Sequence, residues 1–252
     1  MAERTALVTG VSRRIGIGFT VARRLAADGW NVLATGWRPH DAEQPWGADA
    51  DDPVPALTKG LPDGRIVYRH ADLADPDVPP ALVDAAVTEF GGVHALVAVH
   101  ARSSLATLAE STVAELDLCW AVNVRGTLQL VRRFAATPEP RRVVLFTSGQ
   151  HYGAMPGELP YVVTKGALQQ VTLSLANELA PLGCTVNCIN PGPVDTGYAD
   201  DDAREHVARR MPFGRWGRPE DTAELVSWLV ADTGAWVTGQ TLVSDGGWGA
   251  RG

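Results

Sequence analysis

Seven short apolar runs, separated by stretches with helical spacing, constrain the fold of this chain more than any other feature. Strands that are apolar along their whole length are typical of a parallel sheet covered by helices on both faces. The sequence therefore predicts an α/β fold. The runs are ALVTG, WNVLATG, GRIVYRHADL, HALVAVHA, RRVVLFTSG, CTVNCINPG and QTLVSDGG.

Length and composition predict one domain that spans residues 1–252. A chain of 252 residues with 45% hydrophobic content can bury one substantial core. No linker and no fixed-period repeat interrupts it. The segment 39–61 is rich in Asp, Pro and Ala and has no clear period, so we expect an enlarged loop after the second strand.

The charge balance and the cysteines narrow the class of protein. A net charge of −7 without a basic stripe argues against a nucleic acid or an anionic membrane as partner. No apolar stretch approaches the ~20 residues of a membrane span, and the N-terminus enters a strand without a signal peptide's pattern. We therefore expect a cytoplasmic protein. Cys119, Cys184 and Cys188 show no zinc-type spacing and are expected as core thiols, with no metal site.

A glycine turn follows the first apolar run. Gly10 ends this run, Gly16 and Gly18 follow, and the stretch FTVARRLAADG then has helical character. Glycines allow close approach of the backbone, and a helix N-terminus offers unpaired N–H groups to a pyrophosphate. Taken alone, the pattern fits an ordinary strand-to-helix loop equally well.

A hydroxyl, a phenol and an amine recur later at a spacing that suits hydride-transfer chemistry. Ser148 precedes Tyr161 by thirteen residues, and Lys165 follows Tyr161 by four. Residues four apart lie on one face of a helix, so the ammonium would stand one turn from the phenol. A phenol with a reference pKa near ~10 needs such a cation to exchange a proton at neutral pH. Tyr-x-x-x-Lys alone is common by chance.

The ordered set of motifs resembles the short-chain dehydrogenase/reductase family in its classical form, and within it 3-oxoacyl-ACP-reductase-like members. The resemblance covers nearly the whole chain and implies a Rossmann-type, doubly wound parallel sheet. Its marks are Thr9 and Gly10 with Gly16 and Gly18, Asp72 with Leu73, Asn123 to Gly126, Ser148, Tyr161 with Lys165, Asn190 to Thr196, and Arg215 to Glu220.

Two features depart from the family pattern. Five residues, VSRRI, separate Gly10 from Gly16, so the phosphate loop is expected to be two residues longer than usual. Where the family typically has Asn-Asn-Ala-Gly at the end of its fourth strand, this chain has Ala98, Val99, His100 and Ala101. In relatives those residues brace the sheet and let the cofactor's ribose approach, and we expect His100 to be structural.

The resemblance implies a role for each matching residue. Tyr161 is the general acid in carbonyl reduction, Lys165 lowers its pKa and holds the nicotinamide ribose, and Ser148 holds the carbonyl oxygen. Asn123 completes the catalytic set by interrupting a helix and holding a water. The expected cofactor contacts are Gly10, Ser12, Arg13, Arg14, Gly16, Ile17, Gly18, Arg38, Asp72, Leu73, Tyr161, Lys165, Pro191, Gly192, Val194 and Thr196.

Charge at the end of the second strand favours NADPH over NADH. NAD-binding folds place an acid ≈20 residues past the glycine turn, for the ribose diol. Here the stretch is Thr-Gly-Trp-Arg ending at Arg38, and Arg13 and Arg14 add two cations. Guanidinium groups suit a 2′-phosphate. Alternatively, some of these arginines are solvated, or Arg38 stacks on adenine, which suits either cofactor.

Substrate recognition is expected from two regions, the stretch after Ser148 and the loop region 197–216. The expected substrate contacts are Ser148, His151, Tyr152, Met155 and Tyr161. The segment 39–61 either folds over the adenine end of the cofactor or is a surface excursion, and we favour the excursion.

The resulting hypothesis is an NADPH-dependent oxidoreductase that reduces a ketone or related carbonyl to an alcohol. The alternatives are an imine or pterin-type reductase on the same fold, and a non-catalytic dinucleotide-sensing protein. Enoyl reduction is disfavoured, because family members that perform it usually space the tyrosine and lysine more widely. The partner is a small-molecule carbonyl compound, and the resemblance implies a homo-oligomer, a tetramer or dimer. The identity of the substrate stays open.

Overall fold

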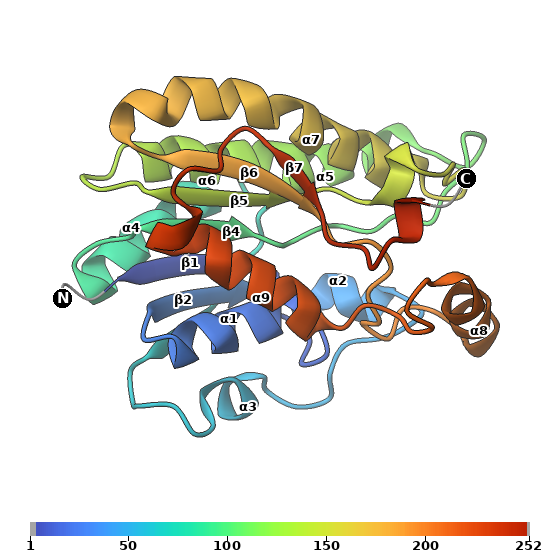
Figure 1. Cartoon of the computed structure of the whole chain (residues 1–252), viewed down its shortest axis with the longest axis horizontal. Coiled ribbons are helices and arrows are strands. Elements are labelled where there is room, and N and C mark those ends of the chain that lie inside the picture. Colours follow the sequence, from blue (N-terminus) through green and yellow to red (C-terminus); the bar gives the residue numbers. More distant parts are fainter. Residues whose placement is uncertain (1–3, 251–252) are drawn as a thin grey trace.

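The computed structural model describes residues 4–250, which form a seven-stranded parallel sheet (Figure 1). The strand order is β3-β2-β1-β4-β5-β6-β7, so the sheet is doubly wound from β1 outward in both directions. Each of the seven predicted apolar runs contains one strand, which confirms the α/β, Rossmann-type prediction. The strands are β1 (Thr5–Thr9), β2 (Asn31–Gly36), β3 (Ile66–His70), β4 (Ala95–Ala98), β5 (Arg142–Phe146), β6 (Thr185–Asn190) and β7 (Thr241–Val243).

Alternation along the strands divides the core into two layers. Leu7 on β1 pairs with Leu33 on β2 and with Leu96 on β4, and all three lie in one apolar cluster. The next residue, Val8, lies in the cluster on the opposite face. Successive side chains of a strand point to opposite faces of the sheet, so a run that is apolar throughout is buried on both faces.

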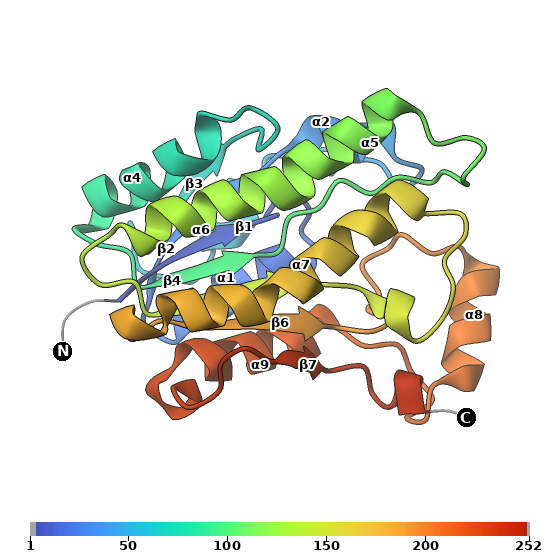
Figure 2. The same ribbon diagram turned by 90° about the horizontal axis from the view of Figure 1, so that it is seen from above.

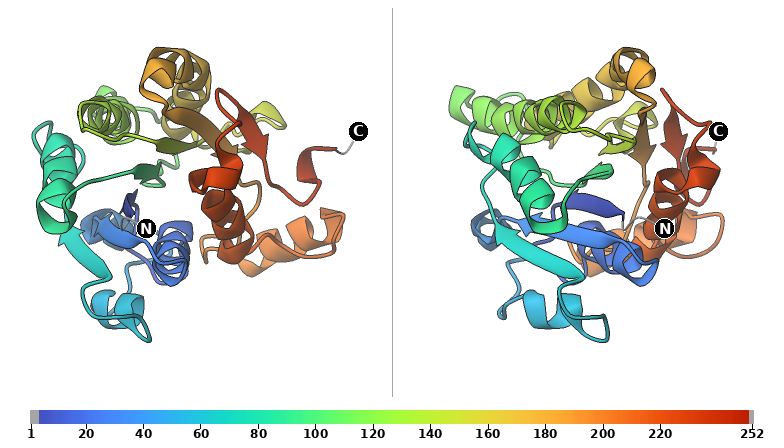
Figure 3. Two further views of the ribbon diagram at one scale, coloured as in Figure 1. Left: turned by 60° about the vertical axis from the view of Figure 1, so that its left-hand side comes forward. Right: turned by 90° about the vertical axis from the view of Figure 1, so that its left-hand side faces the viewer.

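Helices cover both faces of the sheet (Figures 2 and 3). One face carries α1 (Ile17–Ala27) and α9 (Pro219–Val230), and the other carries α4 (Val78–Phe90), α6 (Thr127–Ala135) and α7 (Leu159–Leu179). Helix α5 (Val113–Cys119) runs into α6 through a π-helical turn (Trp120–Gly126). Helix α8 (Asp201–Arg210) lies outside the layers, beyond the carboxyl ends of the strands (Figure 2).

Two sequence expectations about side chains and helices can be checked directly. The three cysteines are free and buried, as expected for core thiols. Within residues 4–250, no helix is both long and apolar enough to cross a membrane.

The segment 39–61 is more than an irregular loop. It contains most of α2 (Arg38–Glu43) and all of α3 (Val54–Thr58). Leu57 is fully buried in the same core cluster as α1. The guanidinium of Arg23 donates to the carbonyl oxygens of Ala56 and Leu57, at 2.7 and 2.9 Å. One leucine and one arginine anchor this segment, which has no hydrophobic periodicity. These are tertiary contacts, and a local sequence pattern does not predict them.

We expect Leu57→Ala to lower the free energy of unfolding by about 2–4 kcal/mol, because truncation of a buried leucine leaves a cavity. Leu182→Ala is the matched control, since this leucine is half exposed, and it should cost far less. Chemical denaturation of both variants measures the difference. Equal, small effects would show that α3 is not part of the core.

Candidate active site

Two adjoining cavities lie at the carboxyl ends of the strands, where open parallel sheets bind ligands. The first, here called the β2 cavity, has a volume of about 320 Å³ and is lined by Thr35, Gly36 and Asp72 among others. The second, the β5 cavity, has a volume of about 400 Å³ and reaches Ser148 and Tyr161. Gly10, Ser12, His40, Asp41, His100 and Ala101 line both cavities, so the two form one continuous cleft.

Helix α7 presents Tyr161 and Lys165 from its first two turns. It begins at Leu159 with Pro160 in its first turn, where a missing N–H costs nothing. Lys165 is only 2% exposed, its Nζ donates to the carbonyl oxygen of Phe146 at 3.1 Å, and it lies 5.6 Å from the centre of the Tyr161 ring. The predicted one-turn juxtaposition is therefore present.

Burial shifts the pKa of both groups toward their neutral forms. Burial raises the pKa of the Tyr161 phenol above its ordinary value, while a hydrogen bond with Ser148 acts in the opposite direction. Burial lowers the pKa of Lys165 to about 8. The phenol therefore holds its proton at neutral pH, and the amine carries a charge that is only weakly favoured.

Asn123 occupies the π-helical turn between α5 and α6 and is fully buried. Its Oδ1 accepts from the backbone N–H of Arg102 at 2.6 Å, and its Nδ2 donates to the carbonyl oxygen of Arg102 at 3.0 Å. The same Nδ2 donates to Thr164 Oγ1 at 2.9 Å, and Thr164 in turn donates to the carbonyl oxygen of Tyr161. The side chain thus fixes the α7 turn that separates Tyr161 from Lys165.

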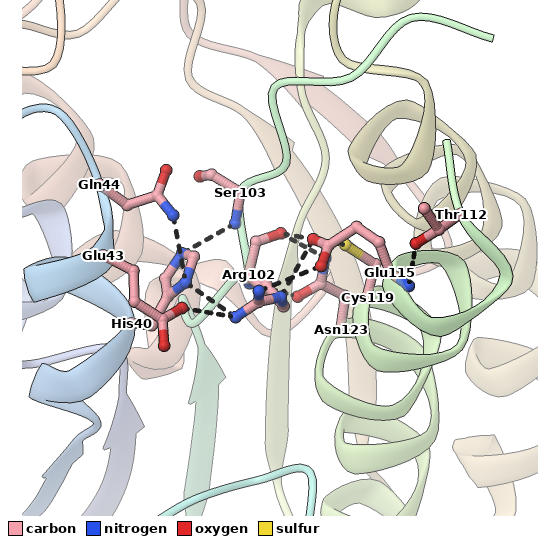
Figure 4. Close-up of polar contacts among 9 residues, drawn as sticks. All are labelled: His40, Glu43, Gln44, Arg102, Ser103, Thr112, Glu115, Cys119 and Asn123. Carbon is pink, nitrogen blue, oxygen red and sulfur yellow. Dashed lines mark hydrogen bonds and ion pairs between the residues drawn. The ribbon is translucent and has the colours of Figure 1, made fainter. Parts of the chain in front are cut away.

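The side chain of Arg102 joins the two walls of the cleft (Figure 4). Its guanidinium binds both carboxylate oxygens of Glu115 on α5, each at 3.1 Å. It also reaches Glu43 and the Nδ1 of His40 on α2, and the Ser103 N–H donates to His40 Nε2 at 3.1 Å. Burial, and then the charge of Arg102, lower the pKa of His40, which keeps the ring neutral. No sequence motif predicts this cluster, because its members come from three distant segments.

The glycine loop fits a dinucleotide. Gly10 has φ +75°, and a Cβ there would lie 2.7 Å from the His100 nitrogen, while a Cβ on Gly18 would meet the Gly10 oxygen at 2.3 Å. No side chain caps the N-terminus of α1 at Gly16, and Gly16, Ile17 and Gly18 line the β5 cavity, so the first N–H groups of this helix are available to a ligand there. Three buried donor atoms near this loop have no partner, namely Nε of Arg13, Nε of Arg38 and Oη of Tyr68. Such donors suit a phosphate.

Most of the predicted cofactor contacts line the cleft. They are Gly10, Ser12, Arg13, Gly16, Ile17, Gly18, Asp72, Leu73, Tyr161, Pro191, Gly192, Val194 and Thr196. Three others do not. Lys165 lies behind Tyr161, Arg38 donates to the carbonyl oxygen of Asp49, and Arg14 pairs with Asp51 at 3.6 Å. The segment 39–61 thus supplies partners to two of the predicted arginines.

The predicted substrate contacts divide similarly. Ser148, Met155 and Tyr161 line the β5 cavity. Tyr152 does not, since it is 43% exposed and its ring packs against Gly249. The side chain of His151 lies outside the described part of the structure. Glu158 and Tyr198 also line the β5 cavity, and they come from the two regions expected to recognise the substrate. Sequence reasoning missed Trp46, Leu105 and the buried Asp41 carboxylate, which reach the cleft from segments without a motif.

His100, which follows Ala98 and Val99 in the segment that replaces the family's Asn-Asn-Ala-Gly, is buried and fully bonded. Its Nδ1 lies 2.6 Å from Thr9 Oγ1, and its Nε2 lies 3.1 Å from the carbonyl oxygen of Val122 and 3.2 Å from Thr127 Oγ1. A carbonyl only accepts, so these partners assign the proton to Nε2. His100 therefore joins β1 and β4 to the turn that carries Asn123, which is the structural role expected for it.

His100 makes the free energy of unfolding depend on pH in a specific way. Burial, and then the charge of Lys165, lower its pKa to about 3. Between that value and the ordinary ~6.5 of an unfolded chain, only the unfolded state binds the proton. Its contribution to stability is therefore complete above pH ~6.5 and is lost as the pH falls toward 3.

We expect His100→Asn to remove this pH-dependent contribution to stability. The slope of unfolding free energy against pH should be shallower in the variant by up to about 1.4 kcal/mol per pH unit, between pH ~6 and ~4. Denaturant titrations across that range measure both slopes. Parallel curves for the variant and the wild type would contradict a neutral, buried His100.

Known proteins share this arrangement. A family model described as "Enoyl-(Acyl carrier protein) reductase" matches residues 10–249. The chain is 34% identical to the uncharacterized oxidoreductase YjdA of Bacillus subtilis, over 97% of this chain and 96% of that protein. It is 33% identical to an NADPH-dependent aldehyde reductase-like protein of Arabidopsis thaliana, over 98% and 95%. A crystal structure of a dehydrogenase/reductase from Sinorhizobium meliloti superposes with a TM-score of 0.85 at 33% identity, over 98% and 96%. The chain therefore belongs to the short-chain dehydrogenase/reductase family of NAD(P)-dependent oxidoreductases.

Proposed function

We propose that this enzyme uses NADPH to reduce a ketone or aldehyde carbonyl to an alcohol, with Tyr161 as the general acid. The observation that carries the proposal is the hydroxyl pair of Ser148 and Tyr161 in one cavity, backed by the buried ammonium of Lys165. The bound cofactor supplies the hydride. The four-residue spacing of Tyr161 and Lys165 favours carbonyl reduction over enoyl reduction within the family.

The residues divide the work of proton transfer. Ser148 donates a hydrogen bond to the carbonyl oxygen, where negative charge develops. Tyr161 enters the reaction protonated, because burial raises its pKa, and it gives its proton to that oxygen. The phenolate left behind is stabilised by the Lys165 ammonium on the same helix face. Asn123 keeps this face in place through Thr164 and the Arg102 backbone.

The unpartnered donors near the glycine loop support NADPH as the cofactor. Arg13 and Arg38 each keep a buried Nε without an acceptor, and the Tyr68 hydroxyl is also unpartnered. Arg13 lines the β5 cavity, and its guanidinium would donate to a 2′-phosphate, whereas Arg38 and Tyr68 line neither cavity and their side chains would have to turn to reach it. The Arabidopsis thaliana relative is named for NADPH dependence, which is in line with this choice.

We further propose a cytoplasmic homo-oligomer that buries the outer face of α5, α6 and α7. These helices lie side by side (Figure 2). Apolar side chains on this face and on the loop before α5 are exposed, and a second copy would cover them. They are Leu108, Val113, Trp120, Val163 and Leu173, with exposed fractions between 48% and 80%.

Replacement of the general acid tests the reaction. We expect Tyr161→Phe to lower kcat for carbonyl reduction by about 10²–10⁴-fold, because the proton donor is lost. Binding of NADPH, followed by its fluorescence, should change little. The loss of NADPH absorbance at 340 nm, in the presence of each of a panel of ketones and aldehydes, measures turnover. Tight cofactor binding by the wild type without turnover of any carbonyl would instead favour the dinucleotide-sensing alternative.

Replacement of one arginine tests the cofactor. We expect Arg38→Leu to weaken NADPH binding by about 10–100-fold and NADH binding far less, because a charge-assisted hydrogen bond contributes about 1.5–3 kcal/mol. Arg141→Leu is the control, since Arg141 lies at the opposite end of the sheet, next to the start of β5, and pairs with Glu139. Titration of each variant with both cofactors measures the ratio. An unchanged NADPH to NADH ratio would assign the preference to other residues.

A further inference from the structure

A single acidic side chain lies at the substrate end of the β5 cavity, the part next to Ser148 and Tyr161. Glu158 lines the cavity there together with Leu105, Met155 and Tyr198. Asp41, the other acid among the described lining residues of this cavity, belongs to α2 on the opposite side of the cleft and also lines the β2 cavity. Among the described residues that line this end of the cavity, Glu158 is therefore the acidic one, while Arg13, from the glycine loop, lines the same cavity.

The backbone holds Glu158 in a fixed place, one turn before Tyr161. Its N–H donates to the carbonyl oxygen of Met155 at 3.1 Å, and its carbonyl oxygen accepts from Val162 at 2.9 Å as α7 begins. A β-bridge pairs it with Ala106, and the neighbouring Leu159 N–H donates to the Ala106 carbonyl at 3.0 Å. The carboxylate is thus attached to a well-anchored element and not to a loop tip.

The carboxylate of Glu158 has no counter-ion. Within residues 4–250, no hydrogen bond or ion pair engages its side chain, although the residue is half-buried. Burial raises its pKa, and no neighbouring cation opposes that shift. A desolvated charge is costly unless a partner compensates it. A cationic ligand in the cavity could take the place of this missing partner.

An aromatic side chain stands beside the same position. Glu158, Tyr198 and Tyr161 all line the β5 cavity, and burial and the charge of Glu158 both raise the pKa of the two phenols. Tyr198 packs edge-on against Trp46 and Trp216, with ring centroids 6.4 and 5.9 Å apart, and this packing fixes its ring. A carboxylate next to an aromatic ring is a suitable environment for an ammonium group, which the ring face also attracts.

We propose that the β5 cavity selects carbonyl substrates that carry an ammonium group, with Glu158 as its counter-ion and Tyr198 as its aromatic wall. The inference rests on the proposed carbonyl reduction and names its substrate class. Leu105 and Met155 provide apolar contact for the chain between the carbonyl and the ammonium group. A substrate with a free carboxylate would be repelled from the same end.

A matched pair of ketones tests the proposal. One is a methyl ketone with a trimethylammonium group three methylenes from the carbonyl, and the other is its isostere with a tert-butyl group in that place. We expect wild-type kcat/KM to favour the cationic ketone by about tenfold or more, which corresponds to about 1.4 kcal/mol. Glu158→Gln should reduce this preference to near unity. Glu220→Gln, at an exposed position of α9, should keep it.

The design separates the two proposals. Binding of both ketones to the enzyme with NADPH is followed by cofactor fluorescence, in addition to turnover. Selective binding of the cationic ketone without turnover of either compound would refute the carbonyl reduction and retain the charge selectivity. Equal binding of the two ketones by the wild type, or a preference that survives in Glu158→Gln, would overturn the role of Glu158.

Discussion

The buried ammonium of Lys165 is the interaction on which the rest of the site depends. A charge that is 2% exposed must be compensated, and the carbonyl oxygen of Phe146 and the nearby phenol are what the fold offers. That carbonyl is available because Phe146 is the last residue of β5, at the carboxyl end of the strand. Placing Lys165 on the first turns of α7 therefore requires the parallel sheet, the helix start at Leu159 and the neutral state of His100 together. A second cation at His100 would face Lys165 across the same low-dielectric interior, which is one reason that its pKa is lowered.

Two polar side chains transmit the geometry of the sheet to this helix. His100 joins the ends of β1 and β4 to the π-helical turn, and Asn123 continues from that turn to the Arg102 backbone and to Thr164. Each donor and acceptor along this path is used, so the path has little freedom to shift. Ala98 and Val99 stand where the family has its two asparagines. His100, the next residue, supplies a bracing contact in this chain, with one ring nitrogen at Thr9 and the other at the π-helical turn.

The fold was predictable because its signals are local, whereas much of the cleft was not. The strands lie in continuous apolar runs that a local pattern identifies, and Tyr161 with Lys165 has a fixed helical spacing. By contrast, Leu57 joins the core from a segment without periodicity, and Arg102 meets His40 and Glu115 from three separate segments. Tyr152 fits the predicted substrate region by sequence position, yet its ring packs against Gly249. Position along the chain predicts an element, but the direction of a loop side chain depends on tertiary packing.

The unpartnered polar groups make the two ends of the cleft electrostatically different. Donors without acceptors, on Arg13, Arg38 and Tyr68, gather where the glycine loop meets β2, whereas Glu158, an acceptor without a donor, lies beside Tyr161. An anion is therefore favoured at one end and a cation at the other, and the distance between them is spanned by a cavity that the Arg102 cluster of Figure 4 crosses. For the proposed NADPH, this polarity would place the phosphates near the glycine loop and the nicotinamide toward Ser148. It also means that a substrate can be selected by charge at a point that the cofactor phosphates do not reach, so cofactor choice and substrate choice can be changed separately by mutation.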